Sequence, residues 1–454
     1  MIKKFFVLIF IGFISSVYSQ ENLFTFENTL KESTIKINEI FNIVDKSTDK
    51  ISLSLLDTRN IYSYLFDDSY NKIGEIKSKN LPMSFKELLG SSINKEAYNY
   101  YFSNYKKTKF GVYTLDFQKG TAISEKVGLN FEKEHYIESF TIDNTFYLLS
   151  VEHNSSKLNI YKFNSSSFEK KALDFSEYQF INKKNQKTNL YNIIKSSKPS
   201  KIIEGNSSSI IEAFNEFKIY IDNNNLQISI DDLFYTTQII TIDLSTNNFN
   251  YEKIKTPFIN AGVSTFKKSN SFLNEGLLFQ ISSSAKEARF KISELSTKKI
   301  LKKYTFPISK TITFDPKFIE TKKSKRKTKS FLSRMTIHHM GASVSFSKDS
   351  YNIEIGSYTP AGNSSGVAPG FGNFSSFNFY NSNDIYSKTI NGDFDKNFNY
   401  IEVEKDIKVN NLNNYFRKYK DKIEAKTIFK YKEGSVLGFL IKDSRHLRFM
   451  KFAD

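Results

Sequence analysis

The feature that most constrains this chain is a series of short apolar segments separated by turn residues. Between Ile137 and Phe175, four such segments follow one another within 39 residues. Asp, Asn and Ser dominate the turns between them, and Lys157–Phe163 alternates apolar and polar side chains. Short alternating segments with such turns are typical of antiparallel strands. The pattern predicts a compact four-stranded sheet, with strands over 137–142, 145–151, 157–163 and 168–173.

Comparable groups recur along the rest of the chain. A second four-strand unit is expected over 217–254, and its turns are again rich in Asp, Asn and Ser. A recurring unit of about 40 residues indicates a repeat architecture. Further strands are expected over 51–56, 61–66, 72–76, 110–117, 121–127, 276–282, 287–293, 300–306, 342–347, 351–358, 426–431, 435–441 and 447–452.

This grouping of four strands resembles the blades of bacterial β-propellers in the broad class that includes WD40, kelch and YVTN-like repeats. The chain has no Gly-His/Trp-Asp pair, no kelch double glycine and no YVTN string, so no functional residue is transferred from those families. The resemblance implies an all-β protein, a β-propeller of about seven four-stranded blades. Tandem β-sandwiches are the alternative, because they too consist of short strands and turns.

The composition provides a large core without disulfides. Hydrophobic residues make up 39% of the chain, with 44 Phe, 26 Tyr and no Trp. Phe and Tyr both favour strands. The chain contains no Cys, which excludes disulfides, thiol catalysis and cysteine metal sites.

The first 19 residues read as a signal peptide for export. Two lysines precede an apolar stretch from Phe5 to Ile14, and Val17 and Ser19 suit a cleavage after Ser19. The segment resembles the signal peptides of exported Bacteroidetes proteins. We expect the protein in the periplasm, at the cell surface or outside the cell. Residues 20–454 are expected to form one domain, with insertions near 79–109, 176–215, 315–334 and 358–373.

Two of these insertions have a sequence signature. Ser84 with Glu87 is a capping box, which predicts a short helix over 84–89. Residues 358–373 are rich in Gly, Pro and Ser, which indicates a long loop, either a binding element or lid or a disordered segment. No segment after the signal peptide has 18 consecutive apolar residues, so no transmembrane helix is expected.

The chain has a formal net charge of +17. For an exported protein this excess points to an anionic glycan or lipid surface, or to envelope proteins, rather than to nucleic acid. The alternative, which the scattering of most of these charges favours, is a base-composition bias toward Lys on a solvated surface. The densest basic segment is Thr321–Ser330, which we expect to be a solvated loop. Its candidate binding residues are Lys322, Lys323, Lys325, Arg326, Lys327 and Lys329. The alternative is a self-repelling surface loop without a ligand.

One segment has the spacing of calcium ligands. Asp393, Asp395, Asn397 and Glu404 correspond to oxygen positions of a calcium-binding loop. Such a loop has Gly at its sixth position to allow a sharp turn, and this chain has Phe398 there. We therefore expect a polar turn leading into a strand and predict no metal site, with calcium as the alternative.

No nucleophile elbow, phosphate loop or dinucleotide fingerprint is present, and we predict neither catalytic residues nor a cofactor. The sequence favours an exported, non-catalytic binding or scaffold protein of the cell envelope, which contacts proteins or polyanions through its propeller loops. The alternative is a secreted hydrolase or lyase acting on polysaccharide, built on the same scaffold.

Overall fold

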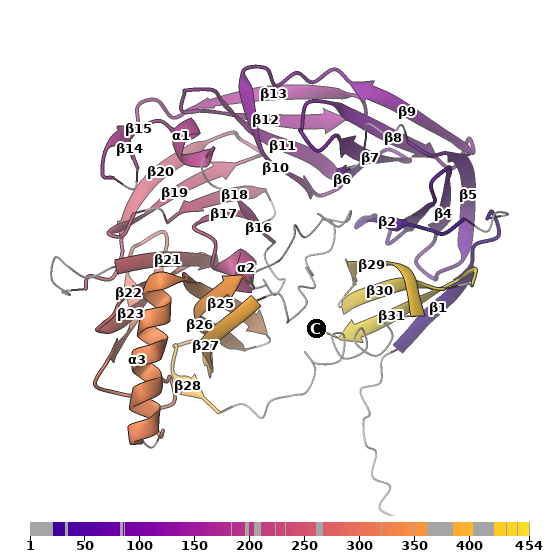
Figure 1. Cartoon of the computed structure of the whole chain (residues 1–454). Coiled ribbons are helices and arrows are strands. Elements are labelled where there is room, and N and C mark those ends of the chain that lie inside the picture. Colours follow the sequence, from indigo (N-terminus) through magenta and orange to yellow (C-terminus); the bar gives the residue numbers. More distant parts are fainter. Residues whose placement is uncertain are drawn as a thin grey trace, which may run out of the picture.

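The computed structural model is an all-β protein in which antiparallel sheets follow one another around a ring (Figure 1). It describes residues 21–31, 35–81, 85, 87–182, 184–195, 199–203, 210–222, 224–231, 233–259, 267–318, 320–347, 349–360, 385–402, 422–432, 434–442 and 444–453.

Seven sheets of four or five strands form the blades of a β-propeller, as the repeat pattern predicted. We number the blades in chain order. Blade 1 contains β2 (Glu39–Val44), β3 (Ile51–Leu56), β4 (Asn60–Phe66) and β5 (Lys72–Lys79). Blade 2 contains β6 (Glu87–Asn94), β7 (Ala97–Ser103), β8 (Phe110–Asp116) and β9 (Thr121–Val127). Blade 3 contains β10 (Glu134–Ile142), β11 (Thr145–Glu152), β12 (Lys157–Asn164) and β13 (Ser167–Asp174).

The remaining blades follow the same order, with one additional strand. Blade 4 contains β16 (Ser200–Ile203), β17 (Phe217–Asp222), β18 (Asn225–Ile230), β19 (Thr236–Asp243) and β20 (Phe249–Lys255), and β16 pairs with β17 in parallel. Blade 5 contains β21 (Lys267–Asn274), β22 (Leu277–Ser284), β23 (Glu287–Glu294) and β24 (Ile300–Pro307). Blade 6 contains β25 (His339–Ser347), β26 (Ser350–Pro360), β27 (Ile385–Phe394) and β28 (Tyr400–Ile401).

Blade 7 joins the two ends of the described chain. Its strands β29 (Ile423–Tyr431), β30 (Gly434–Ile441) and β31 (His446–Ala453) are completed by β1 (Glu21–Glu27). β1 pairs with β31 in antiparallel orientation, from Glu21 opposite Lys451 to Glu27 opposite His446. The ends are therefore held together by one sheet, shown in indigo and yellow in Figure 1.

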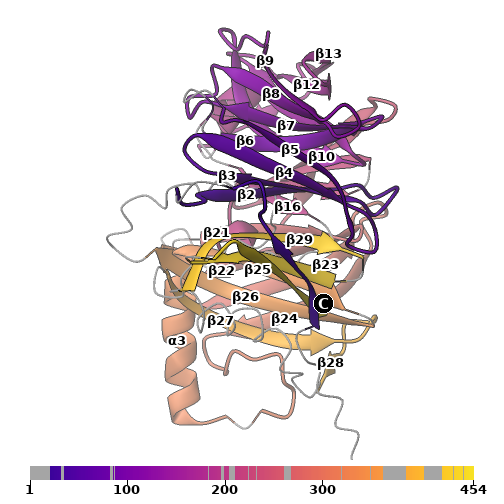
Figure 2. The ribbon, with the colours of Figure 1, turned by 90° about the vertical axis from the view of Figure 1, so that its right-hand side faces the viewer.

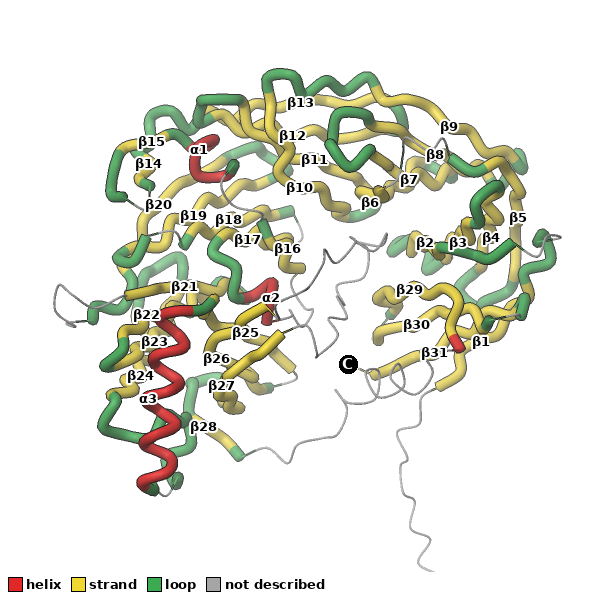
Figure 3. Tube along the Cα trace, viewed as in Figure 1, coloured by secondary structure: helices red, strands yellow, loops and turns green. Residues whose placement is uncertain are grey.

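The core lies between the faces of successive blades. One hydrophobic cluster joins blade 7 to blade 1, and others join blade 1 to blade 2, blade 2 to blade 3 and blade 3 to blade 4. A larger cluster joins blades 4, 5 and 6. The last strands of the blades, such as β9 and β13, are mostly exposed, whereas the first strands line the inside of the ring (Figure 3).

Two sequence-based expectations about residues 79–109 are wrong. Residues 87–89 begin strand β6 and are not part of a helix, and β6 with β7 belongs to blade 2 rather than to an insertion. Gly90 in β6 lies against blade 3, where a Cβ atom would come within 2.2 Å of the Phe146 ring. Glycine within a strand often marks such close packing.

Two other additions connect blade 3 to blade 4 and blade 5 to blade 6. Residues 176–215 form the two-stranded sheet of β14 (Phe180–Ile181) and β15 (Lys187–Thr188), the helices α1 (Leu190–Ile194) and α2 (Ile210–Ala213), and β16. Helix α3 (Lys322–Ile337), the longest in the described part of the chain, connects blades 5 and 6. Among the described residues, no helix has the length and apolar character needed to cross a membrane.

Candidate functional site

The predicted basic segment forms the first half of helix α3, so the expectation of a solvated loop is wrong. Thr321 caps the helix, and its side chain accepts a hydrogen bond from the backbone of Ser324 at 3.0 Å. In return, the Ser324 hydroxyl accepts a hydrogen bond from the backbone N–H of Thr321 at 2.9 Å and donates one to the Thr321 carbonyl oxygen at 2.8 Å. This reciprocal capping box, followed by Lys and Arg residues with good helix propensity, favours a helix start here.

The other half of α3 holds the helix on the propeller. Phe331, Leu332 and Met335 are buried in the cluster shared by blades 4 to 6. Their spacing of three and four residues places them on one helix face. The helix packs against β22, β25 and β26, and Figure 2 shows it beside the strands of blades 5 and 6. Considering the sequence beyond Ser330 would have revealed this apolar face.

All six predicted basic residues lie on the exposed side of the same helix. We call Lys322, Lys323, Lys325, Arg326, Lys327 and Lys329 the basic face of α3. The one ion pair recorded for them among the described residues joins Lys325 Nζ to Glu320 Oε2 at 3.1 Å. The pKa of Glu320 is lowered, first by the backbone N–H of Thr311 and then by Lys325. The basic face thus presents a concentrated positive charge to solvent.

The position of these cations in the helix is electrostatically unfavourable. The N-terminal end of a helix carries a partial positive charge, which favours acidic residues there. The first turn of α3 has no acidic residue and instead contains Lys322, Lys323 and Lys325. Lysines repel both this helix end and one another. A bound anion would relieve both repulsions.

Further cations adjoin α3 from blades 5 and 6. Lys388 Nζ in β27 donates to Ser330 Oγ at 3.0 Å. Lys268 Nζ in β21 donates to the His338 carbonyl oxygen at 2.9 Å, and Arg334 of α3 itself donates to the Tyr386 carbonyl oxygen in β27 at 3.2 Å. The pKa of Lys388 is lowered by burial and by the charges of Arg334 and Lys327. These contacts fix the helix to the sheets and extend the positive region around it.

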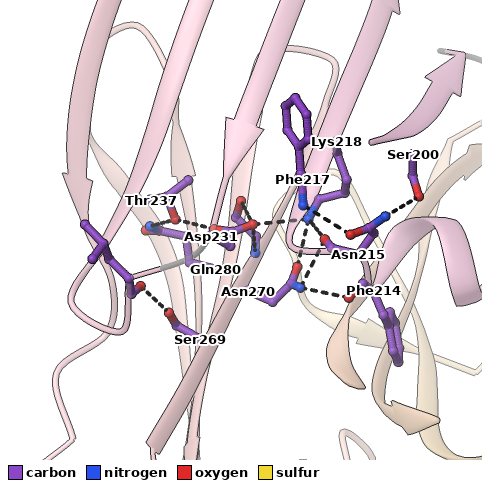
Figure 4. Close-up of polar contacts among 12 residues, drawn as sticks. Ser200, Phe214, Asn215, Phe217, Lys218, Asp231, Thr237, Ser269, Asn270 and Gln280 are labelled. Atoms are coloured by element: carbon purple, nitrogen blue, oxygen red, sulfur yellow. Dashed lines mark hydrogen bonds and ion pairs between the residues drawn. The ribbon is translucent and has the colours of Figure 1, made fainter. Parts of the chain in front are cut away.

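A second charged group, which the sequence did not reveal, lies buried between blades 4 and 5 (Figure 4). Lys218 and Asp231 have fully buried side chains, and Lys218 Nζ lies 3.1 Å from Asp231 Oδ2. Lys218 also donates to Asn270 Oδ1 at 3.0 Å. Asp231 accepts from Ser271 N at 2.9 Å and from Thr237 Oγ1 at 2.8 Å.

This group acts as a structural connection. Burial lowers the pKa of Lys218, while the neighbouring Asp231 carboxylate opposes that shift. Both groups have hydrogen-bond partners on either side of the interface between the blades, which is what a buried ion pair requires. With no exposed side-chain surface, Lys218 is closed to a substrate.

The candidate calcium ligands that the structure describes form hydrogen bonds within the protein. Asp395 Oδ1 accepts the backbone N–H groups of Asn397 at 2.9 Å and Asn399 at 2.8 Å, and these bonds close a turn. Asp393 Oδ1 accepts from Asn352 Nδ2 at 2.7 Å. Glu404 lies outside the described residues. In the part of the chain that is described, no group of three or more His, Asp or Glu side chains could hold a metal ion.

The turn at Phe398 is sharper than the sequence indicated. Phe398 adopts the left-handed backbone conformation with a φ of 59°, although we expected that conformation only for a Gly at this position. Its buried ring stacks on Tyr351 with ring centroids 5.0 Å apart. Ring burial offsets the backbone cost, which is about 1–2 kcal/mol. The chain then enters β28, as the prediction of a polar turn before a strand required.

The long Gly/Pro/Ser segment 358–373 is described only to Pro360, at the end of β26. Its remaining residues lie outside the described part of the chain, as does the predicted signal peptide.

No protein-family model and no curated protein matches this chain. Among solved structures, the Nup133 β-propeller domain of Vanderwaltozyma polyspora matches with a TM-score of 0.30 and 11% identity, over 93% of this chain and 99% of that one. Prolyl oligopeptidase B of Galerina marginata matches with a TM-score of 0.31 and 10% identity, over 89% of this chain and 46% of that one. An apocarotenoid oxygenase of Synechocystis matches with a TM-score of 0.29 and 7% identity, over 61% of this chain and 62% of that one. Similarities of this size carry no argument about activity.

Proposed function

We propose that this protein is an exported, non-catalytic binding protein of the cell envelope, and that it attaches to an anionic glycan or lipid headgroup surface through the basic face of α3. The observation that carries this proposal is the arrangement of six exposed cations on one rigid helix. A fixed cluster attracts a polyanion more strongly than scattered charges do, because the attractions act together on neighbouring anionic groups.

The free-energy cost of placing lysines in the first turn of α3 also supports a binding role. Lysines in the first turn of a helix oppose its dipole, and the capping box and buried apolar face of α3 must offset that cost. Local features that oppose folding are expected at functional sites. Base-composition bias toward lysine explains scattered charges, but it does not explain the concentration of six cations in the first half of one helix.

The export part of the proposal rests on residues 1–19. Cleavage after Ser19 would leave Gln20 as the first residue, directly before β1. The strand that completes blade 7 would therefore remain in the mature protein. Fusing residues 1–22 to a reporter that is active only outside the cytoplasm tests this part, and an inactive reporter would contradict it.

The binding part is tested by co-sedimentation of the mature protein with vesicles of phosphatidylglycerol and phosphatidylcholine, and by titration with polygalacturonate. We expect binding to at least one of these anionic surfaces, none to pure phosphatidylcholine vesicles, and weaker binding as salt is added. Equal binding to neutral and anionic surfaces would contradict a charge-based contact.

A further inference from the structure

The four most exposed large hydrophobic side chains of the described residues lie on one face of the propeller. They are Tyr235, Phe258, Ile337 and Tyr386, with exposed fractions of 61% to 67%, and we call them the apolar rim. Tyr235 directly precedes β19, and Phe258 lies in the connection from β20 to β21. Ile337 ends α3 just before β25, and Tyr386 is near the start of β27. The first and third antiparallel strands of these blades begin at the same face, so the four side chains belong to one face.

Tyr235 and Phe258 lie on neighbouring segments beside blade 5. The backbone N–H of Thr256 donates to the Tyr235 carbonyl oxygen at 3.0 Å, which joins the turn before β19 to the segment that carries Phe258. Arg289 Nη1 of β23 donates to the Phe258 carbonyl oxygen at 2.6 Å. Arg289 also forms an ion pair with Glu287 at 3.1 Å, so the cation offsets the negative charge of that carboxylate here.

Ile337 and Tyr386 lie at the end of α3, among further cations. Lys268 Nζ of β21 donates to the Ile337 carbonyl oxygen at 3.4 Å, and Arg334 of α3 donates to the Tyr386 carbonyl oxygen at 3.2 Å. The pKa of His338 is lowered by burial and by the charges of Arg334 and Lys268, in agreement with the closeness of both cations. Helix α3 thus links the apolar rim, at its last turn, to the basic face, in its first half.

This combination of side chains fits a membrane surface. Single exposed hydrophobic residues are common on soluble proteins, and the informative observation is that these four share a face. Apolar side chains beside a cluster of cations favour an anionic membrane, because apolar burial and electrostatic attraction act together. Tyr and Phe are also suited to the headgroup region. The aliphatic side chain of Ile337 gains from burial among lipids, whereas it offers a sugar neither a hydrogen bond nor a flat ring.

We propose that the face formed by the apolar rim and α3 docks on an anionic lipid membrane, with the rim side chains inserted between headgroups that contact the basic face. This inference rests on the proposed function and selects lipid from the two anionic surfaces considered there. It adds an apolar part to the contact, which screening by salt does not remove.

The chain has no Trp, which allows a direct test of insertion. Phe258→Trp in the full mature chain introduces a single fluorophore in the rim, and Ile123→Trp introduces one at an exposed position on the outer strand of blade 2. Vesicles of phosphatidylglycerol and phosphatidylcholine should shift the fluorescence of the Phe258→Trp protein to shorter wavelength, and lipids with brominated acyl chains should quench it. The Ile123→Trp protein should change little.

A second comparison measures how much the rim contributes to affinity, without any change in net charge. One variant replaces three rim residues with Ser, namely Phe258, Ile337 and Tyr386. The control replaces three exposed isoleucines of outer strands with Ser, namely Ile73, Ile123 and Ile300. We expect vesicle binding to fall about tenfold or more in the rim variant and about twofold or less in the control. Urea unfolding checks that both variants fold, which we expect because all six side chains are exposed.

Three outcomes would overturn the inference and leave the proposed function standing. The first is co-sedimentation of the Phe258→Trp protein with anionic vesicles without a spectral shift or quenching. The second is equal vesicle binding by the two triple variants, and the third is binding of the wild type to polygalacturonate but not to vesicles. A wild type that binds neither anionic surface would instead contradict the proposed function, and this inference with it.

Discussion

At the scale of single residues, the buried pair Lys218–Asp231 shows how the propeller accommodates charge. Each member has partners besides the other, which reduces the cost of removing both from water. The sequence could not predict this pair. The partners of Asp231 come from β17, β19 and β21, which are far apart in the chain. Contacts across blades depend on sheet register, and one sequence does not specify that register.

We expect Lys218→Met to lower the free energy of unfolding by about 3–5 kcal/mol, because it leaves Asp231 buried without its cation. Urea denaturation measures this change. Lys396→Met is the control, since the pair of Lys396 with Asp349 is exposed, with side-chain exposures of 62% and 84%. The control should unfold almost as the wild type does. Similar effects for the two variants would show that the buried pair is unimportant.

Glu39 in β2 gives a prediction about pH. Burial raises the pKa of Glu39 from 4.5 to about 7, so the folded protein holds a proton that the unfolded chain releases near pH 4.5. This contribution to stability is fully present below pH 4.5 and is lost as the pH rises to about 7. In denaturation experiments across this range, Glu39→Gln should gain stability relative to the wild type as pH increases. A constant difference between the two proteins would contradict the assignment.

At the scale of elements, the sequence predicted the second to fourth strands of most blades and missed several first strands. The missed strands β6 and β21 contain Ser91, Ser92, Asn270 and Ser271, which are polar yet buried. Their polarity interrupts the alternation on which strand prediction depends. The helical segment was missed for another reason: its charged half was considered without the apolar residues that follow it.

Helix α3 should owe its stability to its apolar face and not to its charges. Leu332 is fully buried, and we expect Leu332→Ala to cost about 2–5 kcal/mol in the free energy of unfolding. Ser333→Ala, at the exposed neighbouring position, should change it by less than about 0.5 kcal/mol. Thermal and urea unfolding measure the stability of both variants. Equal stabilities would mean that packing of α3 against the core does not stabilise the helix.

At the scale of the whole molecule, blade 7 combines strands from the two ends of the described chain. β1 adds backbone pairing to β31 and also aromatic packing, since the Phe24 ring stacks on Phe449 with centroids 4.3 Å apart. Phe26 packs edge to face on Tyr64 of blade 1. The sequence-based reading predicted about seven blades but missed β1, because pairing between distant segments leaves no local pattern.

Removing residues 20–27 should expose the edge of β31 and leave blade 7 without its fourth strand. We expect a large fall in melting temperature and self-association through the free edge, measured by calorimetry and light scattering. A synthetic peptide of residues 20–31 should restore much of the stability when added. A truncated protein that melts as the full chain does would show that β1 does not stabilise blade 7.

The arrangement of charge on α3 is the central claim, and the most direct test compares two variants of equal net charge. One replaces the six cations of the basic face with Gln. The other replaces six exposed lysines scattered over blades 2 and 3 and the segment that follows blade 3, Lys106, Lys126, Lys162, Lys171, Lys184 and Lys187. We predict that binding to the anionic surface, at one ionic strength, falls about tenfold or more in the first variant and about twofold or less in the second. Equal losses in the two variants would contradict the proposal, because they would show that binding follows net charge alone.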